Sequence, residues 1–408
     1  MFIGIDDTDS PGGMCTTYIG AVLTRRLEEA GIRVCQADLI RLNPNVPWKT
    51  RGNAAICLEC TGELDPAFAI ACHCVEDLAE FSAAQTHPGV VAVQEKPHRE
   101  FYYRALRTFC TIDEARTVLD AEHARYRGYK LGRGLIGALA AVCADLPDWT
   151  SEILAYRNPA RRNAARCVDR ESFFRADAAT FPHTWDTVDR DNKTVVCVPH
   201  TPDPVLFGIR GESPEQVRRA RELIVTEQPE LEQVWVTNQG TDAHLLPGTM
   251  GDLTEGMSYS IRGTVLAPVR THPGGHVQLE IGNGLHSLRC MAYEPTKGFR
   301  NCVRALHPGD SVVVTGSFKG NSLNMEKFCL AAAGIQEVRD SPVCCGRRMT
   351  SAGRGKGFKC RKCGSRKQET IVRAAQTRIA LGWYEVPSCA RRHLAKPLCR
   401  GAPAIPPE

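Results

Sequence analysis

Three aspartates follow closely on one short apolar run at the amino terminus of this chain. Residues 2–5 read as a buried strand, and Asp6, Asp7 and Asp9 come directly after it. Three carboxylates within four residues repel one another unless a cation lies among them. Oxygen ligands of this kind suit Mg²⁺, so Asp6 and Asp7 are candidate magnesium ligands and all three are candidate catalytic groups. The alternative is structural, because aspartates after a strand also serve as turn and helix-capping residues.

A helix must begin close to these aspartates. A Pro-Gly-Gly turn at 11–13 is followed by Cys15, Thr16 and Thr17, and apolar residues then recur at helical spacing up to Leu27. The free N–H groups of a first helical turn can hold phosphate oxygens. A strand, an acidic loop and a helix start together predict a place for a metal–phosphate complex.

Two further stretches carry cations that could meet phosphate. The loop 41–53 places Lys49 and Arg51 beside Trp48, a combination that suits an anion or a nucleobase, although an ordinary surface loop is the alternative. In the stretch YKLGRGLIGALAAVC, Lys130, Arg133 and Gly134 open an apolar helix whose end could bind an anion. Small residues at such a position also serve simple helix packing.

Four cysteines near the carboxyl end have the spacing of a metal site. Cys360-x-x-Cys363-Gly is one zinc knuckle, and its counterpart is the adjacent pair Cys344-Cys345-Gly. Four thiolates from two hairpins fit tetrahedral Zn²⁺. Neighbouring residues point in different directions, however, so the alternative is a pair of hairpins held by packing alone.

The charge of the chain is divided unevenly along its 408 residues. The net charge is +5, but residues 341–408 hold 15 Lys and Arg against 3 acidic residues, so the remainder is acidic. A basic tail on an acidic body predicts a polyanionic partner held by the tail. No apolar run approaches the roughly 20 residues that span a bilayer, and the amino terminus lacks a signal-peptide pattern. We therefore expect a cytoplasmic protein with no membrane partner.

The secondary-structure pattern predicts several domains. Residues 1–100 read as strand–helix–strand–strand–helix–strand, the order of a ferredoxin-like split βαβ unit, and 101–165 read as mainly helical. A second strand–helix–strand set spans 194–244. Five short strands between 256 and 335, separated by Gly, Pro and Asn, resemble an OB-fold barrel, a fold that commonly binds single-stranded nucleic acid.

Several long, unusual motifs lie in one order along nearly the whole chain. They are GIDDTDSPGGMCTTY, RLNPNVPWKTRGNAA, LGRGLIGALAA, VLFGIRGE, TNQGTDAHL, SAGRGKGFKCRKCG and CARRHLAKPL. With these motifs the sequence resembles the archaeal tRNA-isoleucine 2-agmatinylcytidine synthetase family. The resemblance implies a multidomain α/β protein: a kinase-like domain (1–165), a ferredoxin-like domain (166–252), an OB fold (253–338), and a zinc ribbon with a basic tail (339–408).

The resemblance also implies a reaction. Family members are ATP-dependent ligases that attach agmatine to C2 of the wobble cytidine in an isoleucine tRNA with a CAU anticodon, so that the base pairs with A rather than G. ATP is converted to AMP, and the cytidine is activated by phosphorylation before the amine attacks. The family's phosphorylated threonine matches Thr16. The cofactors implied are ATP, Mg²⁺ and Zn²⁺.

Agmatine carries a guanidinium group, which favours a planar carboxylate partner. Asp203 and Asp242 lie at expected strand ends and turns, where binding groups are common, and Arg210 and Asn238 lie beside them. These four are the expected agmatine-binding residues. His200 or His244 could help to deprotonate the amine, although each is more commonly a hydrogen-bonded turn residue.

Two other functions remain open at this point. One is a non-catalytic RNA-binding protein in which the barrel and ribbon do the work and the acidic loop is structural. The other keeps the ATP site but attaches a different amine to tRNA. Magnesium-dependent conversion of ATP to AMP separates the first alternative from a ligase, and mass spectrometry of tRNA nucleosides separates the second.

Overall fold

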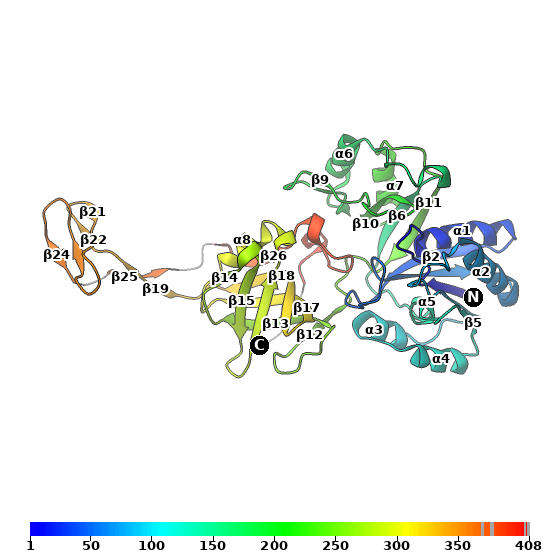
Figure 1. Cartoon of the computed structure of the whole chain (residues 1–408), viewed down its shortest axis with the longest axis horizontal. Helices are drawn as coiled ribbons and strands as arrows, with labels where there is room; N and C mark the ends of the chain where they lie inside the picture. Colours follow the sequence, from blue (N-terminus) through cyan, green and yellow to red (C-terminus); the bar gives the residue numbers. More distant parts are fainter. Residues whose placement is uncertain (369–370, 376–378, 404, 406–408) are drawn as a thin grey trace.

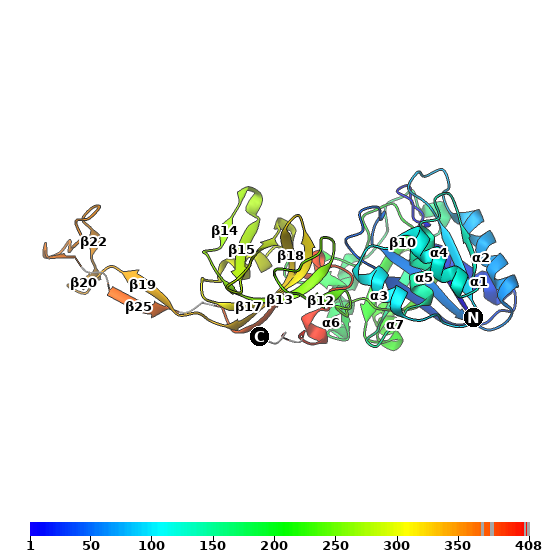
Figure 2. The ribbon, with the colours of Figure 1, turned by 90° about the horizontal axis from the view of Figure 1, so that it is seen from below.

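The chain folds into three parts that lie along one line. The computed structural model describes residues 1–368, 371–375, 379–403 and 405. A large sheet with helices lies at one end, a β-barrel lies in the middle, and a small cysteine-bearing unit lies at the far end (Figure 1). The view from below shows the same order (Figure 2). Among the described residues, no helix is both long and apolar enough to cross a membrane.

The first half of the large sheet has the element order expected from the sequence. It contains β1 (Phe2–Asp6), α1 (Thr16–Glu29), β2 (Val34–Arg41), β3 (Ala54–Cys60), α2 (Leu64–Leu78) and β4 (Gly89–Val93). Its strands lie in the order β4-β1-β3-β2, and all pairs are antiparallel. The predicted strand–helix–strand–strand–helix–strand pattern is therefore confirmed.

Side chains on each strand alternate between the two faces of the sheet. Both faces of this half-sheet carry buried apolar side chains, and helices cover both. Ile3 and Ile5 pack in one core with α1 and α2. The opposite core includes Val91 and residues of α3 (Glu100–Arg107), α4 (Ile112–Ala121) and α5 (Gly134–Val142). Gly4 faces α5 so closely that a Cβ there would lie 2.3 Å from the carbonyl oxygen of Ala138. Helix α5 is thus held tightly against β1, beside the acidic loop.

The expectation that residues 101–165 are mainly helical is only partly correct. Besides α3, α4 and α5, this stretch forms the edge strand β5 (Arg125–Gly128) and the buried strand β6 (Thr150–Tyr156). Strand β6 is buried along its whole length, so its side chains lack the alternation that marks a half-exposed strand.

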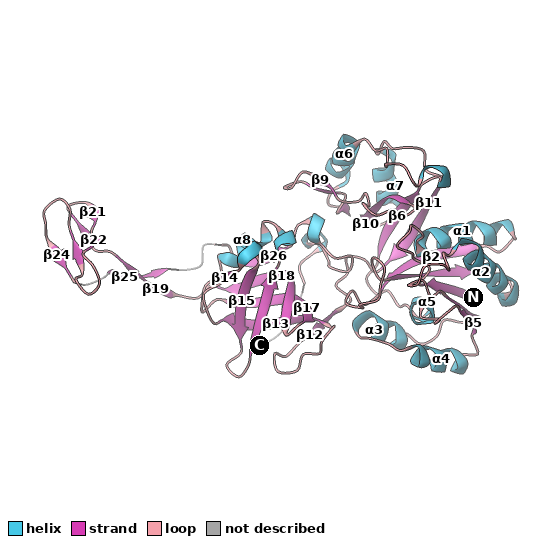
Figure 3. Cartoon of the chain, viewed as in Figure 1, coloured by secondary structure: helices cyan, strands magenta, loops and turns pink. Residues whose placement is uncertain are grey.

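The second half of the sheet joins the first without a break. Its strands are β11 (Leu231–Thr237), β6, β10 (Val205–Gly211) and β7 (Thr184–Trp185), in that order, with α6 (Arg170–Thr180) and α7 (Pro214–Glu222) packed on it. A small hairpin of β8 (Val188–Asp189) and β9 (Thr194–Val195) lies nearby. Parallel pairing of β11 with β2 makes one nine-stranded sheet. Figure 3 shows these strands as one layer between helices.

The middle part is a closed five-stranded barrel. Strands β13 (Ser258–Val265), β15 (Val277–Gly282), β16 (Ser287–Ala292), β18 (Ser322–Ala332) and β17 (Ser311–Lys319) pair in this order, and β17 pairs back with β13. Helix α8 (Phe299–Arg304) lies between β16 and β17 in the sequence. Two short strands pair with members of the barrel: β12 (Leu245–Pro247) with β13, and β14 (Arg270–Thr271) with β15.

The chain leaves the barrel, forms the small unit and then returns. A ladder of β19 (Gln336–Asp340) and β25 (Ile371–Ala375) leads to five two-residue strands: β20 (Val343–Cys344), β21 (Arg347–Arg348), β22 (Thr350–Ser351), β23 (Phe358–Lys359) and β24 (Arg366–Lys367). Strand β26 (Gly382–Glu385) then pairs with β18 of the barrel. Residues 386–401, named here the return segment, contact both the barrel and the large sheet.

Candidate active site

The acidic loop lies where β1 meets the start of α5. Asp6, the last residue of β1, lies against Gly137, where an added Cβ would come within 1.8 Å of an Asp6 carboxylate oxygen. Asp7 follows in the left-handed region, with φ of 56°. Its carboxylate accepts two hydrogen bonds from Arg133, at 2.9 Å from Nε and 3.2 Å from a terminal nitrogen. Arg133, predicted to bind phosphate, is therefore paired with Asp7, predicted to bind a metal ion.

Asp9 joins the acidic loop to the start of helix α1. One carboxylate oxygen accepts hydrogen bonds from the backbone N–H of Thr16 at 2.6 Å and from its hydroxyl at 3.0 Å. The other oxygen lies 3.2 Å from the Arg51 guanidinium. Because Asp9 holds the Thr16 hydroxyl directly, it can orient this group and accept its proton.

Burial makes the acidic loop unfavourable for negative charge. Burial, together with the neighbouring Asp7, raises the pKa of Asp6 well above its usual value. Burial also raises the pKa of Asp7 to about 6, although the Arg133 hydrogen bonds oppose this shift. A bound cation would favour the ionised carboxylates, so this environment fits Mg²⁺. A magnesium ion here would also take ligands from substrate phosphates.

The acidic loop opens into a pocket of about 680 Å³, named here the first pocket. Asp6, Asp7 and Asp9 line this pocket together with two exposed aromatic rings, Trp48 and Phe109. The ring centroids are 6.4 Å apart and the rings are tilted by 48°. Rings in this position offer a π-face on which a nucleobase can stack.

A second pocket, of about 990 Å³, lies on the other side of Asp9 and Thr16. The two pockets share both of these residues, together with Gly52 and Ala54. The second pocket combines carboxylates with apolar wall, a combination that suits a cationic amine on an alkyl chain. Its acidic lining consists of Asp9, Glu152, Asp186 and Asp203, and its apolar lining includes Leu154, Val196 and Val205.

Asp203 is fixed in this wall by an arginine. The Arg166 side chain donates hydrogen bonds to the carbonyl oxygens of Thr201, Asp203 and Val205 at 2.9, 3.0 and 3.0 Å. The same guanidinium lies 3.5 Å from the Asp203 carboxylate. Arg166 therefore holds the shape of the 201–205 loop, and with it the position of the predicted agmatine ligand.

Arg210 also lines the second pocket, as the sequence predicts. Its guanidinium lies 3.1 Å from Glu152 and 3.6 Å from Asp186, and it contacts the His393 ring at 2.6 Å. A cation in this place cannot itself bind a guanidinium ligand, so its role is to hold the neighbouring carboxylates.

Several predicted residues lie outside both pockets. Lys130 donates to the carbonyl oxygens of Phe81 and Ala83, and Gly134 packs where a Cβ would lie 2.4 Å from the Asp6 carbonyl oxygen. Lys49 lines the first pocket, whereas Arg51 lines the second. The structure thus brings only part of the predicted phosphate set together.

The predicted agmatine set is divided in the same way. Asn238 is buried and bonds to the Arg41 backbone and to the Tyr102 hydroxyl. Asp242 pairs with Lys327 of the barrel at 2.7 Å. The alternative base His244 is buried against Glu326, and His200 is exposed. Asn238 and Asp242 therefore connect parts of the fold and line neither pocket.

Among the residues of the second pocket that sequence reasoning missed are Asp186, Glu152 and His393. Glu152 is a buried carboxylate on β6, contacted by Gln239, Arg210 and Arg41. His393 comes from the return segment, more than 150 positions after the other residues that line this pocket. An acidic residue in an otherwise apolar strand, TSEILAY, was the available signal for Glu152. The position of His393 had none beyond its place in the motif CARRHLAKPL.

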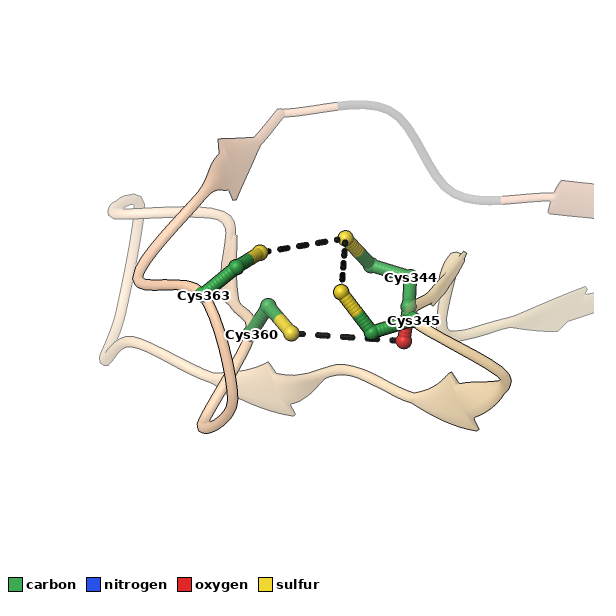
Figure 4. A group of neighbouring side chains, drawn as sticks. All are labelled: Cys344, Cys345, Cys360 and Cys363. Carbon is green, nitrogen blue, oxygen red and sulfur yellow. Dashed lines mark hydrogen bonds between the residues drawn. The ribbon is translucent and has the colours of Figure 1, made fainter.

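The four cysteines converge in the small unit at the far end. The Sγ atoms of Cys344, Cys345, Cys360 and Cys363 all lie within 4.8 Å of one another (Figure 4). Cys345 adopts a left-handed conformation, with φ of 50°, and Gly346 continues it with φ of 74°. This turn brings two adjacent thiols toward the same point, so adjacency does not prevent a four-thiolate site. The residues fit tetrahedral Zn²⁺.

Comparisons with known proteins cover nearly the whole chain. Three family models match: the TiaS TCKD domain at residues 2–65, the TiaS FLD domain at 132–244, and the TiaS C-terminal zinc ribbon domain at 341–378. The chain is 49% identical to the isoleucine-tRNA 2-agmatinylcytidine synthetase TiaS of Methanocorpusculum labreanum, over 98% of this chain and 97% of the relative. It is 44% identical to the protein of the same name from Methanosarcina mazei, with the same coverage.

Solved structures give the same result. A complex of TiaS with its isoleucine tRNA and ATP matches with a TM-score of 0.89 at 42% identity, covering 99% of this chain and 98% of that one. A complex of TiaS with the same tRNA, AMPCPP and agmatine matches with a TM-score of 0.89 at 39% identity, with the same coverage.

Proposed function

This chain belongs to the TiaS family of isoleucine-tRNA 2-agmatinylcytidine synthetases, and we propose that its two joined pockets carry out the family's reaction on one cytidine. The protein is a ligase that uses ATP to attach agmatine to an isoleucine tRNA. The observation that carries the assignment of pockets is their common wall: Asp9 and Thr16 line both. We assign ATP to the first pocket and agmatine to the second. A cytoplasmic location is part of this proposal, because ATP, agmatine and tRNA must meet there.

The chemistry requires a leaving group at C2 of the target base. The C2 oxygen of cytosine leaves badly, but transfer of a phosphoryl group from ATP to that oxygen makes it part of a phosphate leaving group and leaves ADP. Transfer of a second phosphoryl group, from ADP to the Thr16 hydroxyl, would leave AMP, and hydrolysis of that phosphothreonine would restore the enzyme. The primary amine of agmatine then attacks C2, the C–O bond breaks and phosphate departs. The target base must therefore lie between the phosphoryl donor and the amine, at the wall that the two pockets share. To reach the site, the base would be flipped out of the anticodon stack.

The acidic loop serves the phosphoryl transfer in this scheme. Asp6 and Asp7 would hold Mg²⁺, which neutralises charge on the phosphate oxygens. Asp9 would orient the Thr16 hydroxyl, the proposed phosphoryl acceptor on the enzyme, and take its proton. Arg133 lines the first pocket beside Asp7 and would contact a phosphate oxygen there. Lys130 and Gly134 have structural roles in this scheme.

The domain functions follow the parts of the fold. We propose that the large sheet combines the kinase-like (1–165) and ferredoxin-like (166–252) units, although β6 lies before residue 166 and pairs with β10 and β11. The closed five-stranded barrel supports an OB fold, and the cysteine unit would bind Zn²⁺ as a ribbon. Barrel and ribbon would grip the RNA while the sheet modifies it.

Mass spectrometry of nucleosides from the reacted tRNA tests the function. With the CAU-anticodon isoleucine tRNA, ATP and Mg²⁺, we expect the cytidine mass increase that corresponds to agmatine, together with one AMP per modified tRNA. Lysine or spermidine in place of agmatine should give no modified nucleoside. A product with either of these amines would contradict the assignment of agmatine, and RNA binding without AMP formation would favour a non-catalytic protein.

Replacing Asp203 tests the amine pocket. We expect Asp203→Asn to raise the KM for agmatine by about 10- to 100-fold, because a charge-assisted hydrogen bond to a guanidinium contributes about 1.5–3 kcal/mol. Steady-state kinetics with saturating tRNA and ATP measures the effect, and kcat should change little.

Asp191→Asn is the matched control, since Asp191 is exposed and lines neither reaction pocket. Arg166→Gln should reproduce part of the Asp203 effect, because Arg166 holds the 201–205 loop. If the KM for agmatine stays constant in Asp203→Asn while the affinity for tRNA falls, the second pocket holds RNA instead.

A further inference from the structure

A third pocket beside the two reaction pockets has a strongly cationic lining. It has a volume of about 650 Å³, and the side chains of Arg41, Lys49, Arg51 and Arg392 line it together with His393. None of its lining residues is acidic. We name it the cationic pocket. It shares Lys49 with the first pocket and Arg51 with the second, so it lies next to both.

Two distant segments build the cationic pocket. Arg41 is the last residue of β2, and Lys49 and Arg51 lie in the loop after it. Arg392 and His393 belong to the return segment. Arg392 bonds to Asn45, 3.2 Å away in the loop after β2, and to Ser317 on strand β17 of the barrel. The pocket therefore lies at the seam between the catalytic sheet and the barrel.

The carboxylates that pair with these cations are not among the residues that line the cationic pocket. Asp9 lies 3.2 Å from Arg51, Glu152 lies 3.7 Å from Arg41, and Glu326 lies 3.6 Å from Arg392. Lys49 donates to the carbonyl oxygen of Pro44. Its charge is not balanced by a carboxylate among the ion pairs of the described residues.

The positive charges in this pocket repel one another. Burial, together with Arg392 and Lys319, lowers the pKa of Lys49. Burial and the charges of Arg41, Arg210 and Lys49 lower the pKa of His393 well below its ordinary value, so this ring is neutral. The Nε atom of Arg41 is buried and has no hydrogen-bond partner within the part of the chain that the structure describes. An anion in the pocket would offset the repulsion among these cations.

We propose that Arg41, Lys49, Arg51 and Arg392 bind a phosphodiester group of the RNA chain, next to the nucleotide that the enzyme modifies. This inference rests on the proposed function, because it places the target base in the adjoining pockets. A flipped nucleotide carries its flanking phosphates with it, so a phosphate site within reach of the base pocket would hold the extruded conformation. Anchorage of Arg392 on the barrel links this site to the part of the protein that grips RNA.

The alternative occupant is a phosphate of ATP. A magnesium-bound triphosphate needs carboxylates beside it to hold the metal ion. The first pocket provides three of them, whereas the lining of the cationic pocket provides none. This difference favours a metal-free phosphodiester in the cationic pocket.

Replacing one charged phosphate of the RNA backbone by a neutral methylphosphonate tests the proposal. Full-length protein is titrated with an anticodon stem–loop of the isoleucine tRNA that carries a methylphosphonate either 5′ or 3′ of the target cytidine. We expect one of these two positions to weaken binding about tenfold, because the removed charge faces four cations. The Lys49→Gln and Arg392→Gln variants should bind the unmodified RNA about as weakly, and the methylphosphonate should cost them less than twofold more.

Controls separate the outcomes. Arg218→Gln, which removes an exposed cation from α7, should leave RNA binding and the methylphosphonate effect unchanged. Arg392→Lys keeps the charge and should recover most of the affinity, which excludes a folding defect. Equal methylphosphonate effects in wild type and both variants would overturn the proposal. So would variants that weaken ATP binding but not RNA binding, which would assign the pocket to the nucleotide. Formation of agmatine-modified RNA by the wild type, measured in parallel, shows whether the proposed function itself holds.

Discussion

Asp7→Asn should abolish modification of tRNA while leaving tRNA affinity nearly unchanged. We expect kcat to fall by at least about 1,000-fold, because the substitution removes a charge that holds Mg²⁺ on the phosphates during transfer. The tRNA dissociation constant should stay within about twofold, since Asp7 lines the first pocket and not the cationic pocket. Single-turnover assays and filter binding measure the two quantities separately.

Folding should not explain that loss. In the metal-free protein, burial raises the pKa of Asp7 to about 6, so keeping this carboxyl ionised at neutral pH opposes folding. The folded state therefore loses stability as the pH rises from about 4 to 6, and an amide at this position does not bear that cost. The loss of two Arg133 hydrogen bonds acts in the opposite direction. We expect a melting temperature within a few degrees of wild type.

Asp77→Asn is the matched control, because it removes an exposed carboxylate on α2 that pairs with Arg26. It should retain full activity. If Asp7→Asn weakens tRNA binding and catalysis by the same factor, the acidic loop belongs to the RNA interface and the metal assignment is wrong.

Removal of the cysteine-bearing unit should weaken tRNA binding at least tenfold and flatten its salt dependence. Residues 341–378 contain 11 Lys and Arg and a single acidic residue, so they hold most of the basic excess of the carboxyl end. Each phosphate that the protein no longer neutralises reduces the slope of log K against log salt by about 0.7–0.9. Leu330 of β18 pairs with Gly382 of β26, so a short linker in place of residues 333–381 can join the two strands directly.

Deletion of the whole stretch 341–408 is a different experiment. It also removes β26 and the return segment, in which Arg391 pairs with Asp186 and Glu385, and Arg400 pairs with Asp148 and Glu212. The Arg391–Asp186 pair is buried on both sides, and removing one partner of such a pair costs about 3–5 kcal/mol, whereas the partly exposed Asp148 and Glu212 contribute less. The longer deletion should therefore lower the melting temperature and abolish activity, whereas the linker variant should keep its fold. An unchanged slope of tRNA affinity against salt in the linker variant would show that the cysteine-bearing unit is not part of the RNA interface.

Local patterns carried much of this protein's organisation. A short apolar run predicted β1, short β-type runs separated by Gly, Pro and Asn predicted the strands of the barrel, and the spacing of Cys360 and Cys363 predicted a metal knuckle. The acidic loop was also predicted as a site, because three neighbouring carboxylates are a local electrostatic problem wherever the chain folds. Such features depend on residues within about ten positions of one another, so the sequence alone reports them.

The sites between distant segments could not be found in this way. Glu152 resembles any acidic residue in a strand until Arg41 and Arg210 are placed beside it. Asn238 and Asp242 looked like ligands at strand ends, yet their partners Tyr102 and Lys327 lie in other parts of the fold. Residue type predicts what a side chain can bind, but not which partner reaches it first.

The sequence by itself therefore determined the chemistry available: an acidic loop before a helix, a set of thiolates, a β-rich segment and a basic carboxyl end. Only the tertiary structure decided how these meet, through the parallel pairing of β11 with β2 and the return of residues 386–401 across the seam. The physical reason is that long-range contacts depend on the packing of whole surfaces, in which each residue contributes a small part of the free energy.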